Sequence, residues 1–251
     1  MKTHAITTSI RRSILAGGIL DLASVSHAAT VTWGAAQNIT GDSDVSTAGT
    51  LVAAFNLGGT GVGNTTVNGT TFTGLALSGT GVTSGNFTFA SPGLIGFSGG
   101  GGSVVAPFIN LSASYQTMLS SLVGTLSPTT FSLTMNGLSV GASYQVQLWS
   151  NDSNGFPNSP LTATAGNSIA LNSNASGVAG GLGQYGIGTF TADAASEVIT
   201  FSTGNQALLN GVQLRNLSAV PEPGSALAGM LALGVCLSGV VKRSRRQTVE
   251  A

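Results

Sequence analysis

Gly137-Leu-Ser-Val-Gly-Ala-Ser-Tyr-Gln-Val-Gln-Leu-Trp149 is the stretch of the chain that decides its fold class. Over Ser143–Trp149, Tyr144, Val146 and Leu148 occupy every second position. Successive side chains of a β-strand point to opposite faces, so this period of two predicts a strand that buries these three residues on one face.

The same rhythm recurs along residues 29–218. Phe131–Met135 alternates and ends in an Asn136-Gly137 turn, and Thr65–Phe72 predicts a tight hairpin around Asn68-Gly69. Many short strands separated by turns indicate an all-β fold, an antiparallel β-sandwich. The other expected strands are Leu51–Asn56, Asn86–Phe89, Ile187–Thr191, Val198–Ser202 and Leu208–Leu214.

One short helix is expected within this β-rich domain. Ser114–Val123 carries apolar residues at helical spacing, and Ser112 or Ser114 can cap its first turn. Glycine-rich Ser98–Ser103 has no following lysine or helix, so it predicts a flexible connection rather than a phosphate loop. The apolar face of the helix would consist of Tyr115, Met118, Leu119 and Leu122.

Two segments of the domain resemble a known module. Gly137–Trp149, followed later by Leu208–Arg215, resembles the paired inner strands of jelly-roll modules of the galactose-binding type. This resemblance covers roughly a third of the domain. It implies a jelly-roll-like architecture and indicates no particular ligand.

The first 28 residues are expected to form a signal peptide. A basic start is followed by an apolar middle, Ser13–Leu20, and by the small-residue cleavage pattern Ser26-His27-Ala28. Ala29 or Thr30 would then begin the mature protein. The basic residues are Lys2, Arg11 and Arg12, and the Arg11-Arg12 pair leaves a twin-arginine export route as an alternative.

The C-terminal segment 219–251 has three zones in order. Pro221-Glu222-Pro223 is a rigid, extended tripeptide that lies within the motif at 220–224. Ser225–Val241 carries no charge and predicts a transmembrane helix at the short end of what can cross a bilayer. A basic cluster beside an apolar span stays on the cytoplasmic side, which places the domain outside. This basic tail, at 242–246, contains Lys242, Arg243, Arg245 and Arg246.

This tail resembles a PEP-CTERM sorting signal, whose motif Pro221, Glu222 and Pro223 match residue by residue. Gly224, between the motif and Ser225, is a small departure that loosens the junction with the helix. The resemblance implies an exported bacterial protein that is processed by an exosortase-type membrane protease or transpeptidase and associated with exopolysaccharide. An ordinary single-pass anchor is the alternative.

Ionisable residues are rare between the two signals. Arg215 is the only Lys or Arg in residues 29–218, no His occurs there, and the only cysteine of the chain is Cys236. One cation cannot supply the phosphate contacts of nucleic-acid binding. The missing histidine excludes a histidine-dependent nucleophilic site. The missing cysteine and histidine exclude a disulfide framework and a Cys/His zinc cluster. We therefore expect no cofactor and no catalytic residue.

The loop that follows Trp149 is the candidate ligand site. Trp149 could stack on a sugar ring while Asn151, Asp152 and Asn154 bond its hydroxyl groups. The alternative is a strand that ends in Asx turns, with Trp149 packed under the loop.

The carboxylates offer two weaker hypotheses. Asp42 and Asp44 stand two residues apart, as in some calcium loops, but nothing nearby completes the six or more oxygen ligands, and a solvated turn is the alternative. Asp42 with Asp44, or Asp152 with Asp193, could also form the carboxylate pair of a hydrolase.

Three functions follow from these residues. The first is an exported β-sandwich protein without catalytic activity, held briefly in the inner membrane and then sorted to the cell surface or extracellular matrix. The second is a carbohydrate-binding module that uses the Trp149 loop, and the third is a hydrolase.

Overall fold

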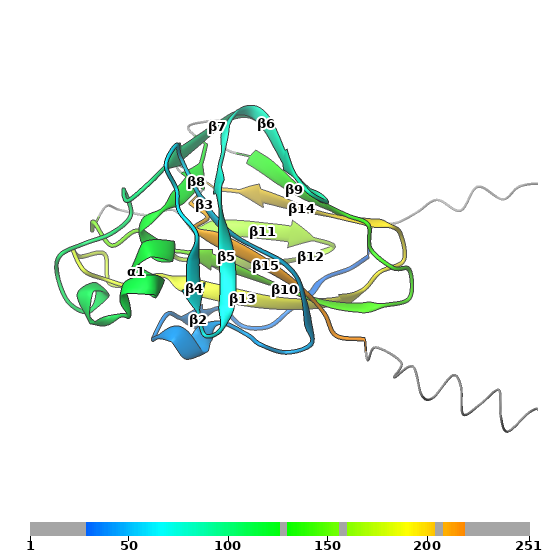
Figure 1. The fold of residues 1–251 in the computed structure, drawn as a ribbon, viewed down its shortest axis with the longest axis horizontal. Coiled ribbons are helices and arrows are strands. Elements are labelled where there is room, and N and C mark those ends of the chain that lie inside the picture. Colours follow the sequence, from blue (N-terminus) through cyan, green and yellow to red (C-terminus); the bar gives the residue numbers. More distant parts are fainter. Residues whose placement is uncertain (1–28, 126–129, 156–159, 204–207, 219–251) are drawn as a thin grey trace, which may run out of the picture.

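The structure is a computed structural model in which the described residues form one β-rich body (Figure 1). The expected signal peptide at 1–28 and the sorting segment at 219–251 lie outside the described residues. Within the part of the chain that is described, no helix is long and apolar enough to span a membrane. The described residues are 29–125, 130–155, 160–203 and 208–218.

Two β-sheets contain most of the described chain, as the all-β prediction requires. Sheet one consists, in spatial order, of β1 (Thr32–Trp33), β13 (Gln184–Thr191), β10 (Ser143–Ser150), β15 (Gly211–Asn216), β3 (Thr50–Gly58), β5 (Thr70–Ala76) and β4 (Thr65–Val67), with β2 (Gln37–Asn38) beside β13. Sheet two consists of β12 (Asn167–Leu171), β11 (Leu161–Ala165), β14 (Ser196–Ser202), β9 (Thr130–Asn136), β7 (Phe87–Phe97) and β6 (Ser78–Ser84), with β8 (Leu122–Gly124) beside β7.

Strand β10 lies in the middle of sheet one, between β13 and β15. It pairs with β15 in antiparallel register from Tyr144 opposite Asn216 to Trp149 opposite Gly211. The two segments that carry the jelly-roll resemblance are therefore neighbours. The sheet is not wholly antiparallel as predicted, because β3 and β5 pair in parallel.

The predicted hairpin forms between β4 and β5. Its two turn residues both adopt positive φ, 46° at Asn68 and 73° at Gly69. Asparagine and glycine tolerate this conformation, which gives the backbone the twist that joins adjacent antiparallel strands. The prediction from Asn68-Gly69 is confirmed.

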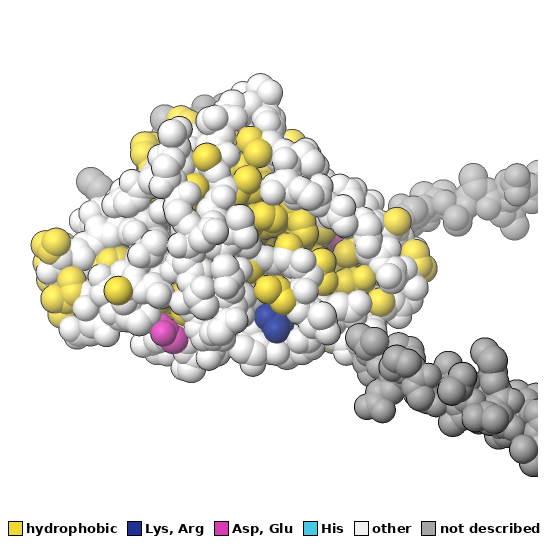
Figure 2. All heavy atoms as spheres, viewed as in Figure 1, with side chains coloured by type: hydrophobic (Ala, Val, Ile, Leu, Met, Phe, Trp, Pro, Cys, Tyr) yellow, Lys and Arg dark blue, Asp and Glu magenta, His cyan; other side chains and the backbone are white. Residues whose placement is uncertain are grey.

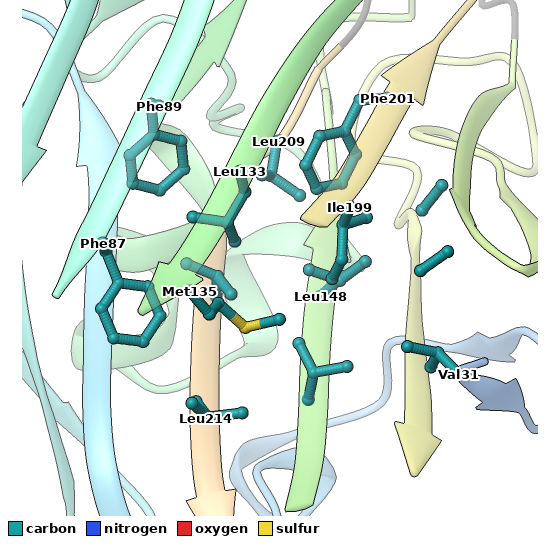
Figure 3. Close-up of a cluster of buried hydrophobic side chains, with 14 of the residues drawn as sticks. Val31, Phe87, Phe89, Leu133, Met135, Leu148, Ile199, Phe201, Leu209 and Leu214 are labelled. Atoms are coloured by element: carbon teal, nitrogen blue, oxygen red, sulfur yellow. The ribbon is translucent and has the colours of Figure 1, made fainter. Parts of the chain in front are cut away.

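The main core lies between the two sheets (Figure 3). Tyr144, Val146 and Leu148 of β10 are buried in it, as the period of two predicted. Sheet two contributes Leu133 and Met135 from β9. Further labelled members of this core are Val31, Phe87, Phe89, Ile199, Phe201, Leu209 and Leu214.

Helix α1 (Ala113–Ser120) is shorter than predicted. The Ser112 hydroxyl caps it by accepting from the backbone N–H of Tyr115 at 3.1 Å. The helix ends because Ser121 is extended, and Leu122, which was expected on the helix face, belongs instead to β8. Two short 3-10 turns, Asp42–Asp44 and Phe108–Asn110, lie outside the sheets.

A second cluster, the helix cluster, packs α1 against the outer face of sheet one. Tyr115, Met118 and Leu119 of α1 are buried there with Phe72 of β5 and Trp149 of β10. Because α1 needs a partner for its apolar face, this end of sheet one is buried on both sides. The remaining members are Ile39, Val45, Ala54, Val67, Phe108 and Leu111.

Candidate functional site

Trp149 belongs to the helix cluster and is 0% exposed. Its indole N–H donates to the Tyr115 hydroxyl at 3.0 Å, and its ring meets Phe72 edge to face with centroids 5.4 Å apart. No face of the indole is open to a ligand. The prediction that Trp149 stacks on a sugar ring is therefore wrong, and the alternative, a packed tryptophan, is confirmed.

Asn151 is also fully buried, and its side chain links three segments of the chain by hydrogen bonds. Its side-chain amide donates to the carbonyls of Gly101 and Leu119 at 3.4 and 3.3 Å. Its side-chain oxygen accepts from the backbone N–H of Gly183 at 2.9 Å. Because these groups join three separate segments, Asn151 holds the loops together and is not free to bond a sugar.

Asp152 and Asn154 form the predicted Asx turn. The Asp152 carboxylate accepts from the backbone N–H and the side-chain amide of Asn154 at 3.1 and 2.9 Å. Asp152 is buried, whereas Asn154 is exposed. Of the four residues predicted to bind a glycan, only Asn154 faces solvent.

Asp44 closes its own turn rather than binding a cation. Its carboxylate accepts from the backbone N–H and hydroxyl of Thr40, each at 2.7 Å, and from the N–H of Gly41 at 3.0 Å. The Tyr115 hydroxyl adds a bond of 3.3 Å. Asp42 accepts from the Ser112 hydroxyl at 2.7 Å, which ties this turn to the start of α1.

These contacts count against calcium at Asp42 and Asp44, because donors already surround the buried carboxylate. In the described ranges no three His, Cys, Asp or Glu residues cluster as metal ligands.

The Asp44 carboxylate also affects two nearby tyrosines. Burial, followed by this nearby charge, raises the pKa of Tyr115 and of Tyr185, so both phenols stay protonated.

The structure separates the other carboxylate pair proposed for a hydrolase. Asp152 follows the carboxyl end of β10, and Asp193 follows that of β13. These strands are antiparallel, with Ser143 opposite Thr191 and Ser150 opposite Gln184, so the two aspartates lie at opposite ends. At about 3.3 Å per residue the separation is on the order of 20 Å, beyond the reach of a glycosidase pair.

Arg215, the domain's one cation, is buried against a segment that we call the strap, residues 44–49. Its guanidinium donates to the carbonyls of Thr47, Ala48 and Gly49 at 3.2, 2.6 and 3.2 Å. Burial lowers the pKa of Arg215. The guanidinium therefore acts as a structural clamp.

Two glutamines continue this clamp along the strap. Gln213 donates to the carbonyl of Ser46 at 3.0 Å and to the side-chain oxygen of Gln147 at 2.7 Å. Gln147 in turn donates to the carbonyl of Asp44 at 2.6 Å and accepts from the N–H of Ser46 at 3.0 Å. Side chains of β10 and β15 thus form hydrogen bonds with the backbone of the strap, as the backbone of a neighbouring strand would.

The surface that does face solvent in this region lies on either side of α1, and we call it the α1 surface. One hollow of about 680 Å³ and another of about 440 Å³ share the exposed residues Ala113 and Thr117. The first is also lined by Gly99, Gly102, Ser103, Val104, Phe108, Gln116, Ser120 and Asn154, and the second by Asn64, Thr65, Thr66 and Ser114.

The lining of the α1 surface carries hydroxyl, amide and apolar groups and no ionisable side chain. Such groups can contact a neutral, hydroxyl-rich ligand, and they cannot transfer a proton near neutral pH. Sequence reasoning reached only Asn154 of this surface. The polar residues of α1 that face away from Tyr115 and Met118 were the signal that could have identified the rest.

Few ionisable side chains reach the surface of the described residues, because Asp44, Asp152, Glu197 and Arg215 are all buried. On the face shown in Figure 2, neutral polar side chains and backbone dominate the described part, and acidic or basic colours are sparse. Val104, Val105 and Ile109 are exposed apolar residues that lie close together in the sequence.

No protein-family model matches the chain, and searches of curated proteins and of solved structures found no match. The chain's own residues therefore carry the functional assignment.

Proposed function

We propose that this chain is an exported, exosortase-sorted protein of the cell surface or extracellular matrix, without catalytic activity and associated with exopolysaccharide. Its signal peptide directs export, and its C-terminal segment holds it briefly in the inner membrane. An exosortase-type protease or transpeptidase then removes the tail.

The observation that carries this proposal is the order of the three zones after the last strand. Pro221-Glu222-Pro223, uncharged Ser225–Val241 and basic Lys242–Arg246 follow β15 within a few residues. A neutral exterior supports the same assignment, because contact among polysaccharide chains needs hydroxyl and amide groups and little charge. The described chain also starts and ends toward the same end of the sandwich's long axis (Figure 1).

Peptide mapping tests the sorting step. Arg215 is the last trypsin site before the tail, so the precursor gives the peptide Asn216–Lys242. We expect this peptide in membrane-bound precursor and a peptide shortened near Pro223 in material released from cells. As a matched control, replacing Pro221, Glu222 and Pro223 together by alanine should leave the long peptide in the membrane. Released protein that still reaches Lys242 would contradict the proposal.

A second role, weak binding of neutral polysaccharide, is favoured by the α1 surface rather than by Trp149. Thr117 is exposed and lines both hollows, so Thr117→Arg places a large, charged side chain at the boundary between them. We expect this variant to lose saturable binding on an array of neutral glycans. Thr164→Arg, an exposed substitution on β11 of sheet two, should bind as the natural chain does. Equal binding by both variants would exclude the α1 surface.

A further inference from the structure

Glu197 is a buried carboxyl group on β14 that the fold leaves without a partner. It is 0% exposed, and neither of its carboxylate oxygens makes a hydrogen bond. It faces the main core because it shares the inward side of β14 with Ile199 and Phe201. A buried carboxylate without a partner is costly, and a cation beside Glu197 would stabilise its charged form.

Ala29, the first described residue, lies beside this carboxyl group. Ala29 is buried in the main core, into which Glu197 points. The backbone N–H groups of Ala29 and Val198 favour the charged form of Glu197, although neither reaches hydrogen-bonding geometry. The charge that acts on Glu197 is that of Asp193, which is also acidic and therefore opposes ionisation.

The position of Ala29 is fixed by the residues that follow it. Val31 is 0% exposed, and its N–H donates to the carbonyl of Ala165 at 2.9 Å. Val31 also forms a parallel bridge with Gly166, where a side chain would collide with Thr30. The chain from Thr30 onward therefore holds the backbone nitrogen of Ala29 near Glu197, whatever precedes it.

We propose that cleavage after Ala28 turns the backbone nitrogen of Ala29 into the missing cation, and that the new α-ammonium pairs with the Glu197 carboxylate. A membrane-bound signal peptidase would use water to hydrolyse the Ala28–Ala29 peptide bond. The hydroxyl goes to the carbonyl carbon of Ala28, and the nitrogen of Ala29 takes up protons to become the ammonium. The inference rests on the proposed export and N-terminal processing.

This pairing discriminates between the two predicted starts of the mature chain. A chain that began at Thr30 would carry its amine one residue further along, about 3.8 Å away. Only a chain that begins at Ala29 places its α-amine beside the Glu197 carboxyl group. Processing would then do more than release the chain, because it would also complete the main core.

The composition offers a direct test, because lysine occurs only at positions 2 and 242. A chain of residues 29–251, released in detergent from a fusion that leaves no extra residue, has just two primary amines. They are the α-amine of Ala29 and the side chain of Lys242. Acetic anhydride at neutral pH, followed by peptide mass analysis, measures the two labelling rates in one sample.

A free α-amine has the lower pKa, about 8 against about 10.4 for lysine, and labels faster. We expect pairing to slow the labelling of Ala29 about tenfold relative to the same amine in the Glu197→Gln chain, as a pKa raised by one unit would give, with Lys242 as the internal reference in each sample. Glu197→Gln should restore fast labelling of Ala29. One additional alanine before Ala29, with Glu197 retained, should do the same if the glutamine variant fails to fold.

Two outcomes overturn the proposal. Fast labelling of Ala29 in the unaltered chain means that no pair forms. Slow labelling that persists in Glu197→Gln and in the extended chain means that burial alone protects the amine. Failure of the underlying export proposal is a different result, since N-terminal analysis of protein recovered from cells would then find no chain that begins at Ala29.

Discussion

Replacing Asn210 by alanine should destabilise the fold more than any other single polar substitution discussed in this chain. Asn210 is 0% exposed, just before β15. Its amide donates to the carbonyls of Leu119, Ser121 and Asn151 at 2.8, 2.8 and 3.0 Å, and its oxygen accepts from the N–H of Asn151 at 2.5 Å. The side chain thereby joins the last turn of α1, the residue between α1 and β8, and the loop after β10.

The magnitude follows from what is left unpaired. A typical buried hydrogen bond contributes about 1 kcal/mol net, and a buried donor without a partner costs about 1–3 kcal/mol. Removing the side chain strands the N–H of Asn151 and weakens three carbonyl contacts. We therefore expect Asn210→Ala to lose about 3–5 kcal/mol of unfolding free energy, a large share of the roughly 5–15 kcal/mol of an ordinary domain.

Trypsin gives a clean assay of this loss. Arg215 is the only trypsin site between residues 29 and 218, and it is buried in the central strand β15. Cleavage there requires opening of the sheet, so pulse proteolysis across a urea gradient reports the unfolding free energy. Asn216→Ala is the matched control, because Asn216 is half-buried and accepts only from the N–H of Ser218, at 2.9 Å. A loss below about 1 kcal/mol in Asn210→Ala, similar to the control, would refute the reasoning.

Three more predictions concern other buried groups. Trp149→Ala should lose about 3–5 kcal/mol in urea unfolding, whereas Trp149→Phe should lose much less and leave glycan-array binding unchanged. Arg215→Met should cost about 2–4 kcal/mol in the same measurement and Arg215→Lys less, since a lysine keeps the charge but cannot reach three carbonyls of the strap. Burial raises the pKa of Glu197 from 4.5 to about 7, with the Asp193 charge as a smaller cause and the amides of Val198 and Ala29 opposing. As the pH rises from 4.5 to 7, Glu197 loses its proton in the unfolded state but keeps it in the folded state, so the unfolding free energy should fall by about 3 kcal/mol. The measurement uses a chain acetylated at Ala29, in which no α-ammonium forms. Glu197→Gln should remove this pH dependence.

The strands that the sequence predicts are those whose alternation involves large apolar residues. Phe131–Met135 and Ser143–Trp149 contrast strongly with their polar neighbours, and both lie in strands with the expected residues buried. By contrast, β6 and β11 consist almost entirely of glycine, serine, threonine and alanine. Small residues give little hydrophobic contrast, so the pairing of these strands is set by their neighbours in the sheet.

The candidate site was harder to predict because it depends on contacts between distant segments. Trp149 stands on the outward side of β10, which alternation alone assigns to solvent, but α1 covers that side. The bond from Trp149 to Tyr115 spans 34 residues of sequence. Pairing the apolar face of α1 with outward-facing Trp149 and Phe72 would have found the helix cluster.

Glu197 could have been found from its own strand. In Ser196–Ser202 it shares the period of Ile199 and Phe201, which assigns a carboxyl group to the core. That conflict between residue type and position is a signal that a buried partner is needed.

The place of β15 in the fold has a consequence for the order of events during the export that we propose. It is the last described strand, yet it lies between β10 and β3 and joins the two halves of sheet one. A chain that crosses a membrane amino end first cannot assemble this sheet until Asn216 has passed through. Pro221 follows Asn216 by only five residues, so under the export that we propose the domain would stay unfolded until the expected membrane segment reaches the translocation channel.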